Sequence, residues 1–583
     1  MPESDKNRKI TFLIFILISL IYALPLLKNI NNWGQMDWDQ FTFWYSLPRK
    51  IIFEFHQFPL WNPYSNGGNV YLAHPHSAFL SPAYIFVLIF GGLLGLKISW
   101  VFHLFFGMLG MFFLSRHLGI LKISAYLAAI IFMFCSMFTL HLSEGHIDWL
   151  GLAYLPWFFL YLLRSKESRK NLVLAVVFFA FMILAASIDV LMVAGIFTGI
   201  YAILKSAQKR KLLFLRNSVL IVLTAITLSS IKLVPMFEFL ERNPRKTVVE
   251  GSTDSALLSQ VLFSRDQAFY YQETKWAWPE GKVKVRGRDF DIGWHEYGAY
   301  VGFLPCILAI FGAFFYFKRY WPLLITGILL LWVSMGGAAI LNLWELIHKL
   351  PVYDSLQVPS RFILGFVFCL SLFAGFGLSK IEEANNKKWQ QVLLGIIVSF
   401  VFLDLFLVDR PLLSNVFTIK PPEIKKHAEF KQRYRDLILF PGESRSSMCF
   451  TLSSNSGIIN SYEVVNVKAG KIAAEGENDY RGEAYLSGNN GEINLIKHTP
   501  GYIEVQVNAL KPDLLVVNQN FYPGWKVKGL ESSKAEPDKG LISAKVPVGK
   551  YKVVFYYFPD SFVIGLALTV LALAGLIIFL LKK

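Results

Sequence analysis

The stretch ITFLIFILISLIYALPLL, residues 10–27, is an apolar run without a charged side chain. Its length is close to the roughly 20 residues that an α-helix needs to cross a bilayer. Lys6, Arg8 and Lys9 precede it, so a secretory signal peptide is the alternative interpretation. Because no small-residue cleavage motif follows, we read the run as an uncleaved first transmembrane span.

The rest of the chain has the composition of a polytopic membrane protein. Of its 583 residues, 54% are hydrophobic and 17% are charged, whereas soluble domains average about a quarter charged. Twelve runs are predicted as transmembrane helices: 10–27, 98–115, 123–141, 150–163, 171–188, 190–204, 212–233, 298–317, 321–336, 361–379, 389–408 and 561–581. The net charge of +16 is assigned to cytoplasmic loops. No basic soluble module indicates nucleic-acid binding.

A further apolar run, 83–96, decides which side of the membrane each loop faces. If it does not cross, all seven basic clusters, including both termini, fall on the cytoplasmic side; if it crosses, six of the seven fall outside. We therefore predict a re-entrant or interface-parallel helix that is entered at Pro82 and broken at Gly91-Gly92. The protein is expected in the cytoplasmic membrane with both termini inside.

This topology divides the chain into three predicted parts. Residues 1–409 form a multi-span membrane domain whose first outer loop is 28–97. Residues 410–559 are polar and contain alternating runs such as 502–507 and β-rich runs such as 550–557, which indicate an extracytoplasmic β-sandwich. Residues 560–583 form a C-terminal transmembrane helix.

Several common sites are excluded by their missing motifs. The four cysteines form no C-x-x-C pair, so neither a zinc site nor a disulfide framework is supported. There is no G-x-x-x-x-G-K-[ST] and no H-E-x-x-H motif, which argues against nucleotide hydrolysis and a zincin site. No predicted span carries a relay of acidic residues, which weakens an ion-coupled transporter.

The first candidate site is Asp37-Trp38-Asp39 in the first outer loop. Alternate residues of an extended segment point to one side, and in a turn they can converge on one ligand. One carboxylate could then act as a general base, or both could bind a cation. His74 and His76, again two apart, are candidates for binding a phosphate, a sugar hydroxyl or a metal.

The second candidate site is the loop Glu144-Gly145-His146-Ile147-Asp148, on the same predicted face. Ionisable groups beside lipid are costly unless they line a polar cavity. Lys232 and Arg361, at predicted span ends, are candidates for holding a lipid phosphate, and Arg361 is preferred because its fork is bidentate. Asp189 and the group 295–297 rank below these loops.

Four features, in this order, give the chain a resemblance to a known family. They are the acidic residues after the first span, Pro59-Leu60-Trp61-Asn62-Pro63-Tyr64 with Gly67-Gly68, Gln357-Val358-Pro359-Ser360-Arg361-Phe362, and Phe521-Tyr522-Pro523-Gly524-Trp525 with Val546-Pro547-Val548-Gly549-Lys550. The chain resembles the GT-C superfamily of polyprenol-dependent membrane glycosyltransferases, and within it the YfhO-type bacterial membrane proteins.

The resemblance implies transfer of a sugar from a polyprenyl phosphate on the extracytoplasmic side. The acceptor would be a cell-envelope polymer, lipid or protein. An Asp of the first outer loop is the usual catalytic residue, which maps to Asp37 or Asp39, and Glu144 or Asp148 would supply the second acidic site. Some members use a divalent cation (Mg²⁺ or Mn²⁺) and others do not; here its candidate ligands are Asp37, Asp39, Glu144 and Asp148.

The residues leave two other function classes open. A transporter or flippase of a lipid-linked glycan would use the same carboxylates only to bind its cargo. A non-catalytic assembly factor would use residues 410–559 to bind an envelope polymer. Substitution of Asp37 and Asp39, and probes of alternating access, separate these classes.

Overall fold

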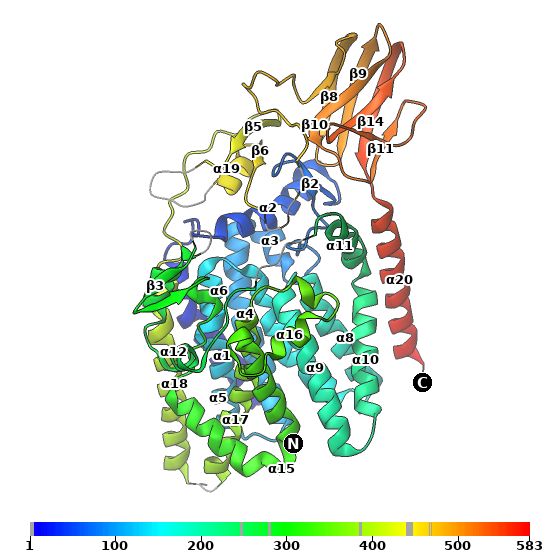
Figure 1. Ribbon diagram of the computed structural model, residues 1–583. Coiled ribbons are helices and arrows are strands. Elements are labelled where there is room, and N and C mark those ends of the chain that lie inside the picture. Colours follow the sequence, from blue (N-terminus) through cyan, green and yellow to red (C-terminus); the bar gives the residue numbers. More distant parts are fainter. Residues whose placement is uncertain are drawn as a thin grey trace.

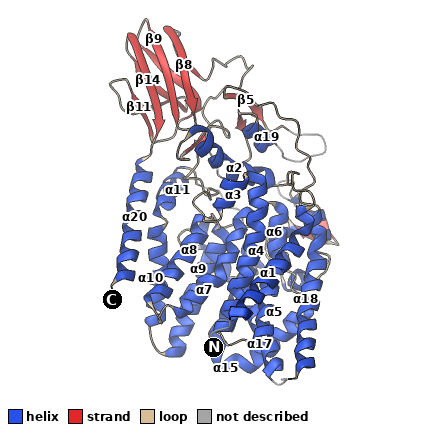
Figure 2. Cartoon of the chain, turned by 180° about the vertical axis from the view of Figure 1, so that it is seen from behind, coloured by secondary structure: helices blue, strands red, loops and turns tan. Residues whose placement is uncertain are grey.

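The computed structural model describes residues 5–244, 249–277, 281–383, 387–438, 447–463, 465, 467 and 469–582. A helical bundle carries a β-sandwich at one end, and the last helix, α20, runs back along the bundle (Figure 1). We call this end of the bundle the sandwich end. Seen from behind, the two layers separate as helices below and strands above, with both chain ends away from the sandwich (Figure 2).

The helical part is built from elements of very different length. Its longer helices are α1 (Asp5–Leu27), α2 (Trp38–Phe55), α4 (Gly92–His117), α5 (Lys122–Phe134), α7 (Leu155–Arg164), α8 (Arg169–Leu184), α9 (Ile188–Lys209), α10 (Leu213–Leu228), α11 (Ser230–Arg242), α15 (Phe303–Ser334), α17 (Ile363–Glu383), α18 (Lys388–Ser414) and α20 (Asp560–Leu581). Its short α-helices are α3 (Tyr84–Phe90), α6 (Ser136–Glu144), α12 (Ser255–Phe263), α13 (Gln267–Thr274), α16 (Leu343–His348) and α19 (Ser447–Ser453). The 3₁₀ turns are η1 (Ile147–Tyr154), η2 (Trp294–Glu296), η3 (Gly336–Ala338), η4 (Tyr353–Ser355) and η5 (Pro359–Phe362).

The predicted fold class, a polytopic helical membrane protein with a C-terminal β-rich region and a last apolar helix, is confirmed. The count of twelve spans is not. Within the described ranges, eight helices are long and apolar enough to cross a membrane, or nine if the bent pair α10 and α11 is one span. The predicted spans 150–163 and 171–188 correspond to the shorter helices α7 and α8.

Two further spans differ because helices are joined or broken locally. The predicted pair 298–317 and 321–336 forms the single element α15, whose two halves meet at Tyr320, the residue before Trp321-Pro322, with non-helical φ −122° and ψ 19°. The run 123–141 is instead divided at Cys135, which is extended between α5 and α6. A hydroxyl-rich turn, Ser136 to Thr139, follows this break.

The segment 83–96 is divided where Gly91 interrupts it. Tyr84–Phe90 forms the seven-residue helix α3, and Gly92 begins α4. Gly91 has φ +87°, a conformation that favours glycine. A Cβ on Gly95 would lie 2.6 Å from the backbone of Val87, so α3 packs closely against the first turn of α4.

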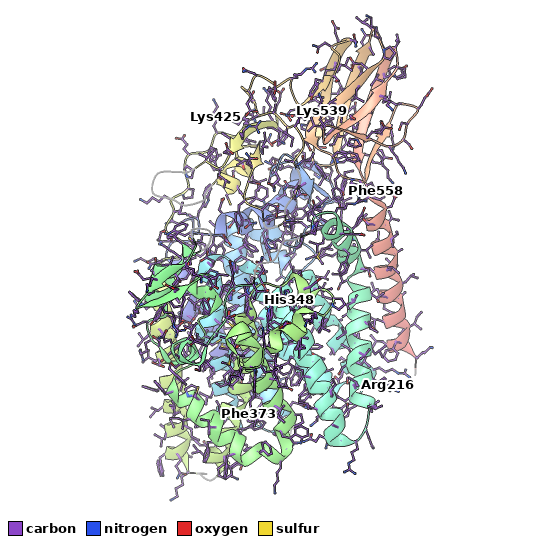
Figure 3. All side chains as sticks on the ribbon, in the orientation of Figure 1. Arg216, His348, Phe373, Lys425, Lys539 and Phe558 are labelled. Carbon is purple, nitrogen blue, oxygen red and sulfur yellow. The ribbon has the colours of Figure 1, made fainter. Side chains whose placement is uncertain are left out.

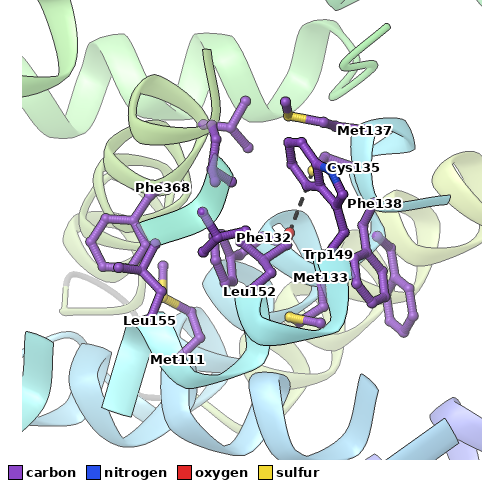
Figure 4. Packing of buried hydrophobic residues seen from close by; sticks show 14 of the residues in the cluster. Met111, Phe132, Met133, Cys135, Met137, Phe138, Trp149, Leu152, Leu155 and Phe368 are labelled. Carbon is purple, nitrogen blue, oxygen red and sulfur yellow. Dashed lines mark hydrogen bonds between the residues drawn. The ribbon is translucent and has the colours of Figure 1, made fainter. Parts of the chain in front are cut away.

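The core of the bundle is apolar and aromatic. Figure 4 shows its packing near the break at Cys135, whose thiol donates to the carbonyl of Phe132. Met133, Phe138 and Trp149 lie in the same fully buried cluster. In Figure 3, Phe558 lies where the sandwich joins α20, and Phe373 lies within the bundle.

The β-sandwich comprises two four-stranded antiparallel sheets. One has the order β12 (Glu536–Asp538), β13 (Leu541–Val546), β10 (Asp513–Asn520), β7 (Ala484–Leu486); the other has β11 (Trp525–Lys528), β14 (Gly549–Tyr557), β9 (Tyr502–Ala509), β8 (Gly491–Thr499). The predicted strand 502–507 lies in β9, where inward residues alternate with more exposed ones. The run 550–557 lies in β14.

The described residues between the end of α18 and the start of β7 form a separate layer between the bundle and the sandwich. Its parallel pair, β5 (Lys431–Asp436) and β6 (Ser456–Asn460), lies beside α19. Helix α19 packs directly on α2. A small hairpin of β3 (Val283–Val285) and β4 (Arg288–Phe290) lies elsewhere, near α13.

The first loop docks into the sandwich through its own hairpin, β1 (Trp61–Asn62) and β2 (Asn69–Val70). The Trp61 indole is 1% exposed, donates to Gln519 Oε1 at 2.8 Å and packs against the Trp525 ring. Asn520 donates to the carbonyl of Gly68. The Pro/Trp/Asn/Pro run is therefore an attachment between the helical part and the sandwich.

Candidate functional site

Asp37 lies at the start of α2, against the loop that follows α6. Its backbone N–H donates to the carbonyl of Glu144 at 2.8 Å. Gly145 has φ +112°, and a Cβ there would lie 2.3 Å from the backbone nitrogen of Trp38. Glycine is thus required at position 145 for the two predicted loops to meet.

A chain of three polar side chains begins at Asp37. His146 Nε2 lies 3.4 Å from Asp37 Oδ2, and both side chains keep about 15% exposure (15% and 14%). The Nδ1 atoms of His146 and His141 are 2.9 Å apart. Burial lowers the pKa of His146, but the hydrogen bond to Asp37 and the Asp37 charge outweigh it and raise this pKa to about 9. Protonated His146 can donate to both neighbours.

Glu144 forms the inner side of this cluster. Tyr271 donates to Glu144 Oε2 at 2.9 Å. His295 Nδ1 lies 3.5 Å from the same oxygen, and His295 Nε2 lies 3.4 Å from Glu296 Oε1. His295 therefore connects two buried carboxylates, Glu144 and Glu296, that the sequence places 152 residues apart.

Arg361 lies between two carboxylates rather than open to a ligand. Its Nε donates to Glu296 Oε2 at 2.6 Å, its Nη2 donates to the other oxygen, and its Nη1 lies 2.6 Å from Asp189 Oδ2. Burial raises the pKa of the Glu296 carboxyl, but Arg361 outweighs it and holds this pKa well below its usual range. Asp189 and Arg361 keep 15% and 20% side-chain exposure, against 2% for Glu296.

Asp148 lies beside these groups without a close ion pair of its own. Burial raises its pKa to about 6, with the charge of His146 opposing and that of Asp189 adding to the shift. The Asp148 carbonyl accepts from Ser187. Its Oδ1 is buried and has no hydrogen-bond partner among the described residues, so this carboxyl is the least satisfied acid of the cluster.

Asp39 has hydrogen-bond partners in a different segment from those of Asp37, because α2 begins between the two residues. Its Oδ2 and Oδ1 accept the backbone N–H groups of Met448 and Cys449, both at 2.9 Å. Asp39 thus satisfies the first turn of α19. Burial raises its pKa to about 6, and the two backbone N–H groups oppose the shift.

His74 and His76 stay close, with ring centroids 5.4 Å apart, but they have different partners. His74 is fully buried, stacks on Trp44 at 3.9 Å between centroids and lies 2.8 Å from Glu463 Oε1 through Nε2. His76 stacks on Phe41 instead. His74 therefore attaches the first loop to the layer that contains Glu463, while His76 lies nearer Phe41 and the Asp37 cluster.

Lys232 is enclosed by backbone carbonyls. Its Nζ donates to Ser77 O at 2.6 Å, Pro75 O at 3.3 Å and Ile183 O at 3.4 Å. The side chain is 2% exposed. Three carbonyl acceptors use the three ammonium donors, so Lys232 holds the 75–77 turn in place.

The structure gives a metal-ligand set that differs from the predicted four carboxylates. Of the residues it describes, the one group of three whose ligand atoms lie within 4.8 Å of one another is His141, His146 and Glu296. His141 Nε2 is buried without a described hydrogen-bond partner, as a ligand atom could be. Glu296, however, is already held by Arg361. Two imidazoles suit a transition metal better than Mg²⁺, which prefers oxygen ligands.

His141 and Tyr271 were not found from the sequence. His141 lies inside an apolar run, although it stands three residues before Glu144 on α6, a helical spacing that puts both on one face. Tyr271 carries no motif. Asp189 and the group 295–297, ranked low from the sequence, supply the partners of Arg361.

The comparisons agree with a membrane protein and leave its activity open. A family model described as a 6-pyruvoyl-tetrahydropterin synthase related domain, membrane protein, matches residues 78–274, about a third of the chain. No curated protein matches significantly. The matched segment includes the loop of Glu144, His146 and Asp148.

Solved structures that are similar to this chain include the following two. One is the arabinofuranosyltransferase AftD from Mycobacteria, with 13% identity and a TM-score of 0.44, over 70% of this chain and 27% of that protein. This chain thus spans about a quarter of the length of AftD. The other is ArnT from Cupriavidus metallidurans bound to undecaprenyl phosphate, with 12% identity and a TM-score of 0.37, over 79% of this chain and 87% of that protein.

Proposed function

We propose that the chain is a membrane glycosyltransferase that moves a sugar from a polyprenyl-phosphate donor to a hydroxyl of a cell-envelope polymer, lipid or protein. The reaction takes place on the extracytoplasmic face, which is the sandwich end. The GT-C resemblance of the sequence supports the reaction class. The observation that carries the proposal is the Asp37–His146 contact, where a carboxylate with 14% exposure lies beside a cluster of charged groups.

Asp37 acts as the general base, and Asp39 does not. Asp37 lies 3.4 Å from His146 and keeps access to solvent, whereas both oxygens of Asp39 are used by α19. His146 orients the Asp37 carboxylate, as a base needs a fixed position within hydrogen-bond reach of its substrate. Protonated His146 also adds a positive charge near the reaction.

Arg361 binds the donor phosphate after an exchange of partners. In the structure Asp189 occupies Arg361 Nη1, and the exposed fractions of both side chains make this the accessible half of the ion-pair network. A phosphate oxygen replaces Asp189, while Glu296 continues to hold Nε and Nη2. Charge-assisted bonds of this kind are stronger than neutral ones.

The transfer is a single displacement. The acceptor oxygen forms a bond to the anomeric carbon and gives its proton to Asp37. The bond from that carbon to the phosphate oxygen breaks, and its electron pair leaves with polyprenyl phosphate. Because the leaving group is already a stable phosphate, no acid is needed, and the anomeric configuration inverts.

The test uses the purified full-length protein in lipid nanodiscs. A panel of undecaprenyl-phosphate sugars carrying glucose, mannose, galactose or arabinose is supplied with membrane acceptors, and released undecaprenyl phosphate is measured. Loss of a positioned base lowers rates by about 10²- to 10⁴-fold, so Asp37→Asn should lose the release. Asp409→Asn, at a buried acid that accepts from Ser136 and Thr139, is the matched control and should retain most of it.

Two outcomes oppose the proposal. If no donor of the panel is consumed by the wild-type protein, or if Asp37→Asn consumes it at the wild-type rate, the catalytic assignment is wrong. Movement of an intact donor across the bilayer of liposomes that contain the protein, without release of undecaprenyl phosphate, would support the flippase alternative instead.

A further inference from the structure

A small cavity lies directly beside Asp37. It is lined by Met36, Asp37, Asp39, Gln40, Leu437, Met448 and Tyr462. The space open to the centre of a water molecule is about 10 Å³, which is room for about one water-sized group. A hydroxyl fits this cavity, and a complete sugar ring does not.

Gln40 brings an unpaired amide to this cavity. The residue is 3% exposed, and neither Nε2 nor Oε1 has a hydrogen-bond partner among the residues that the structure describes. Gln40 follows Asp37 by three positions on α2, so the two side chains share one face of the helix. A buried amide without hydrogen-bond partners destabilises the folded protein, so a polar ligand beside Gln40 is favoured.

The chemistry of the two side chains defines that ligand. An amide offers one acceptor and two donors, and an ionised carboxylate only accepts. A hydroxyl between them donates its proton to Asp37 and accepts a bond from Gln40 Nε2. A phosphate or carboxylate would not fit, because Asp37 and Asp39 both line the cavity and repel an anion.

We infer that this cavity is the acceptor-hydroxyl site, and that Gln40 positions the hydroxyl that Asp37 deprotonates. The inference rests on the proposed function and names the substrate group that occupies the site: a neutral alcohol of a saccharide or polyol.

The layer between bundle and sandwich supplies half of this site. Leu437, Met448 and Tyr462 come from it, and Met448 is fixed by the bond from its backbone N–H to Asp39. The acceptor cavity is therefore closed by residues at least 400 positions after Asp37 in the sequence. Acceptor binding depends on the attachment of α19 to α2.

The test compares Gln40→Met with wild type in the same nanodisc assay, with glycerol as the acceptor probe. Methionine keeps the length of glutamine and removes its polar atoms. We expect kcat/KM for transfer to glycerol to fall about 10- to 100-fold, as for a lost hydrogen bond in a buried site. The Kd for undecaprenyl phosphate should stay within twofold. The Tm should be equal or higher, because an unpaired amide is removed.

Gln57→Met is the matched control. The Gln57 amide donates to Thr499 Oγ1 at 2.8 Å, so this variant should lower the Tm and leave kcat/KM unchanged. The inference is overturned if Gln40→Met transfers to glycerol within twofold of wild type, or if it lowers the Tm as Gln57→Met does. If wild type shows no Asp37-dependent donor consumption, the proposed function itself has failed.

Discussion

Two groups of buried acids in the helical part are satisfied in opposite ways. Asp409 of α18 is fully buried and accepts from Ser136 Oγ at 2.6 Å, from Thr139 Oγ1 at 2.8 Å and from Tyr22. The cluster around Asp37 contains several charged side chains and few hydroxyl groups that donate hydrogen bonds to them. Its His141 Nε2 and Asp148 Oδ1 have no hydrogen-bond partners among the described residues.

The comparison separates structural acids from functional ones. Asp409 ties α1, α6 and α18 together with neutral donors, so removing it should change stability and not chemistry. The Asp37 cluster keeps partial exposure and unsatisfied atoms, which cost stability and leave capacity for a ligand. A buried acid is thus assigned to function when polar atoms in its cluster lack hydrogen-bond partners among the described residues.

The largest expected effect on stability comes from a substitution that breaks the ion pairs of the functional cluster. Arg361→Gln leaves Glu296 buried and uncompensated, and we expect the free energy of unfolding to fall by about 3–5 kcal/mol. Denaturation in mixed detergent micelles measures it. Arg361→Gln with Glu296→Gln should recover part of the loss. A fall below about 1 kcal/mol would mean that the ion pair is not a buried unit.

The second prediction concerns the structural group. Asp409→Leu removes the shared acceptor of three hydroxyls and should lower the free energy of unfolding by about 3 kcal/mol. Asp409→Asn keeps an oxygen acceptor and should cost about 1 kcal/mol. Donor consumption per folded molecule should be unchanged in Asp409→Asn. A specific loss of consumption there would move Asp409 into the functional group.

The third prediction is a pH dependence. The pKa of His146 is raised to about 9, so its stabilising contribution is complete below about pH 6.5 and is lost as the pH rises through about 9. Linkage gives at most about 3 kcal/mol over this window. Measured from pH 6 to 10, the Tm of wild type should fall more than that of His146→Gln. Parallel curves would contradict the protonated state.

The smallest expected effect concerns Asp39, the second carboxylate of the Asp37-Trp38-Asp39 motif. Asp39→Asn weakens two bonds to the first turn of α19 and should cost about 1–2 kcal/mol. Hydrogen exchange should become faster at the amides of Met448 and Cys449. Asp37→Asn is the internal comparison and should leave both amides protected. Equal exchange in Asp39→Asn would show that α19 is held by other contacts.

The sequence predicted features that depend on local pattern. Long apolar runs gave the membrane helices, alternation gave β9, and Gly91-Gly92 gave the break before α4. The different partners of Asp37 and Asp39 were missed because the composition of the loop did not predict a helix beginning at Trp38. Asp409 lies at the end of a predicted span, where a charge is ordinary, and its donors come from α1 and α6.

The candidate site was predicted in its parts and not in its pairing. From topology, Asp37 and the loop of Glu144 and His146 were expected on the same face of the membrane, but their contact was not predicted. The partners of Arg361 did not, because Asp189 and Glu296 come from two different segments and only packing brings them together. Interactions across hundreds of residues leave no local signal in a single sequence.

The hydrogen bond between Trp61 and Gln519 can form only late in the synthesis of the chain. These residues are separated by 458 positions, and at about 5–20 residues per second a ribosome needs roughly 20–90 s to make the later one after the earlier. During that interval the aromatic first loop has no sandwich to bind. A chain that ends before residue 519 never gains it, so premature truncation should yield a species prone to aggregation or to capture by chaperones.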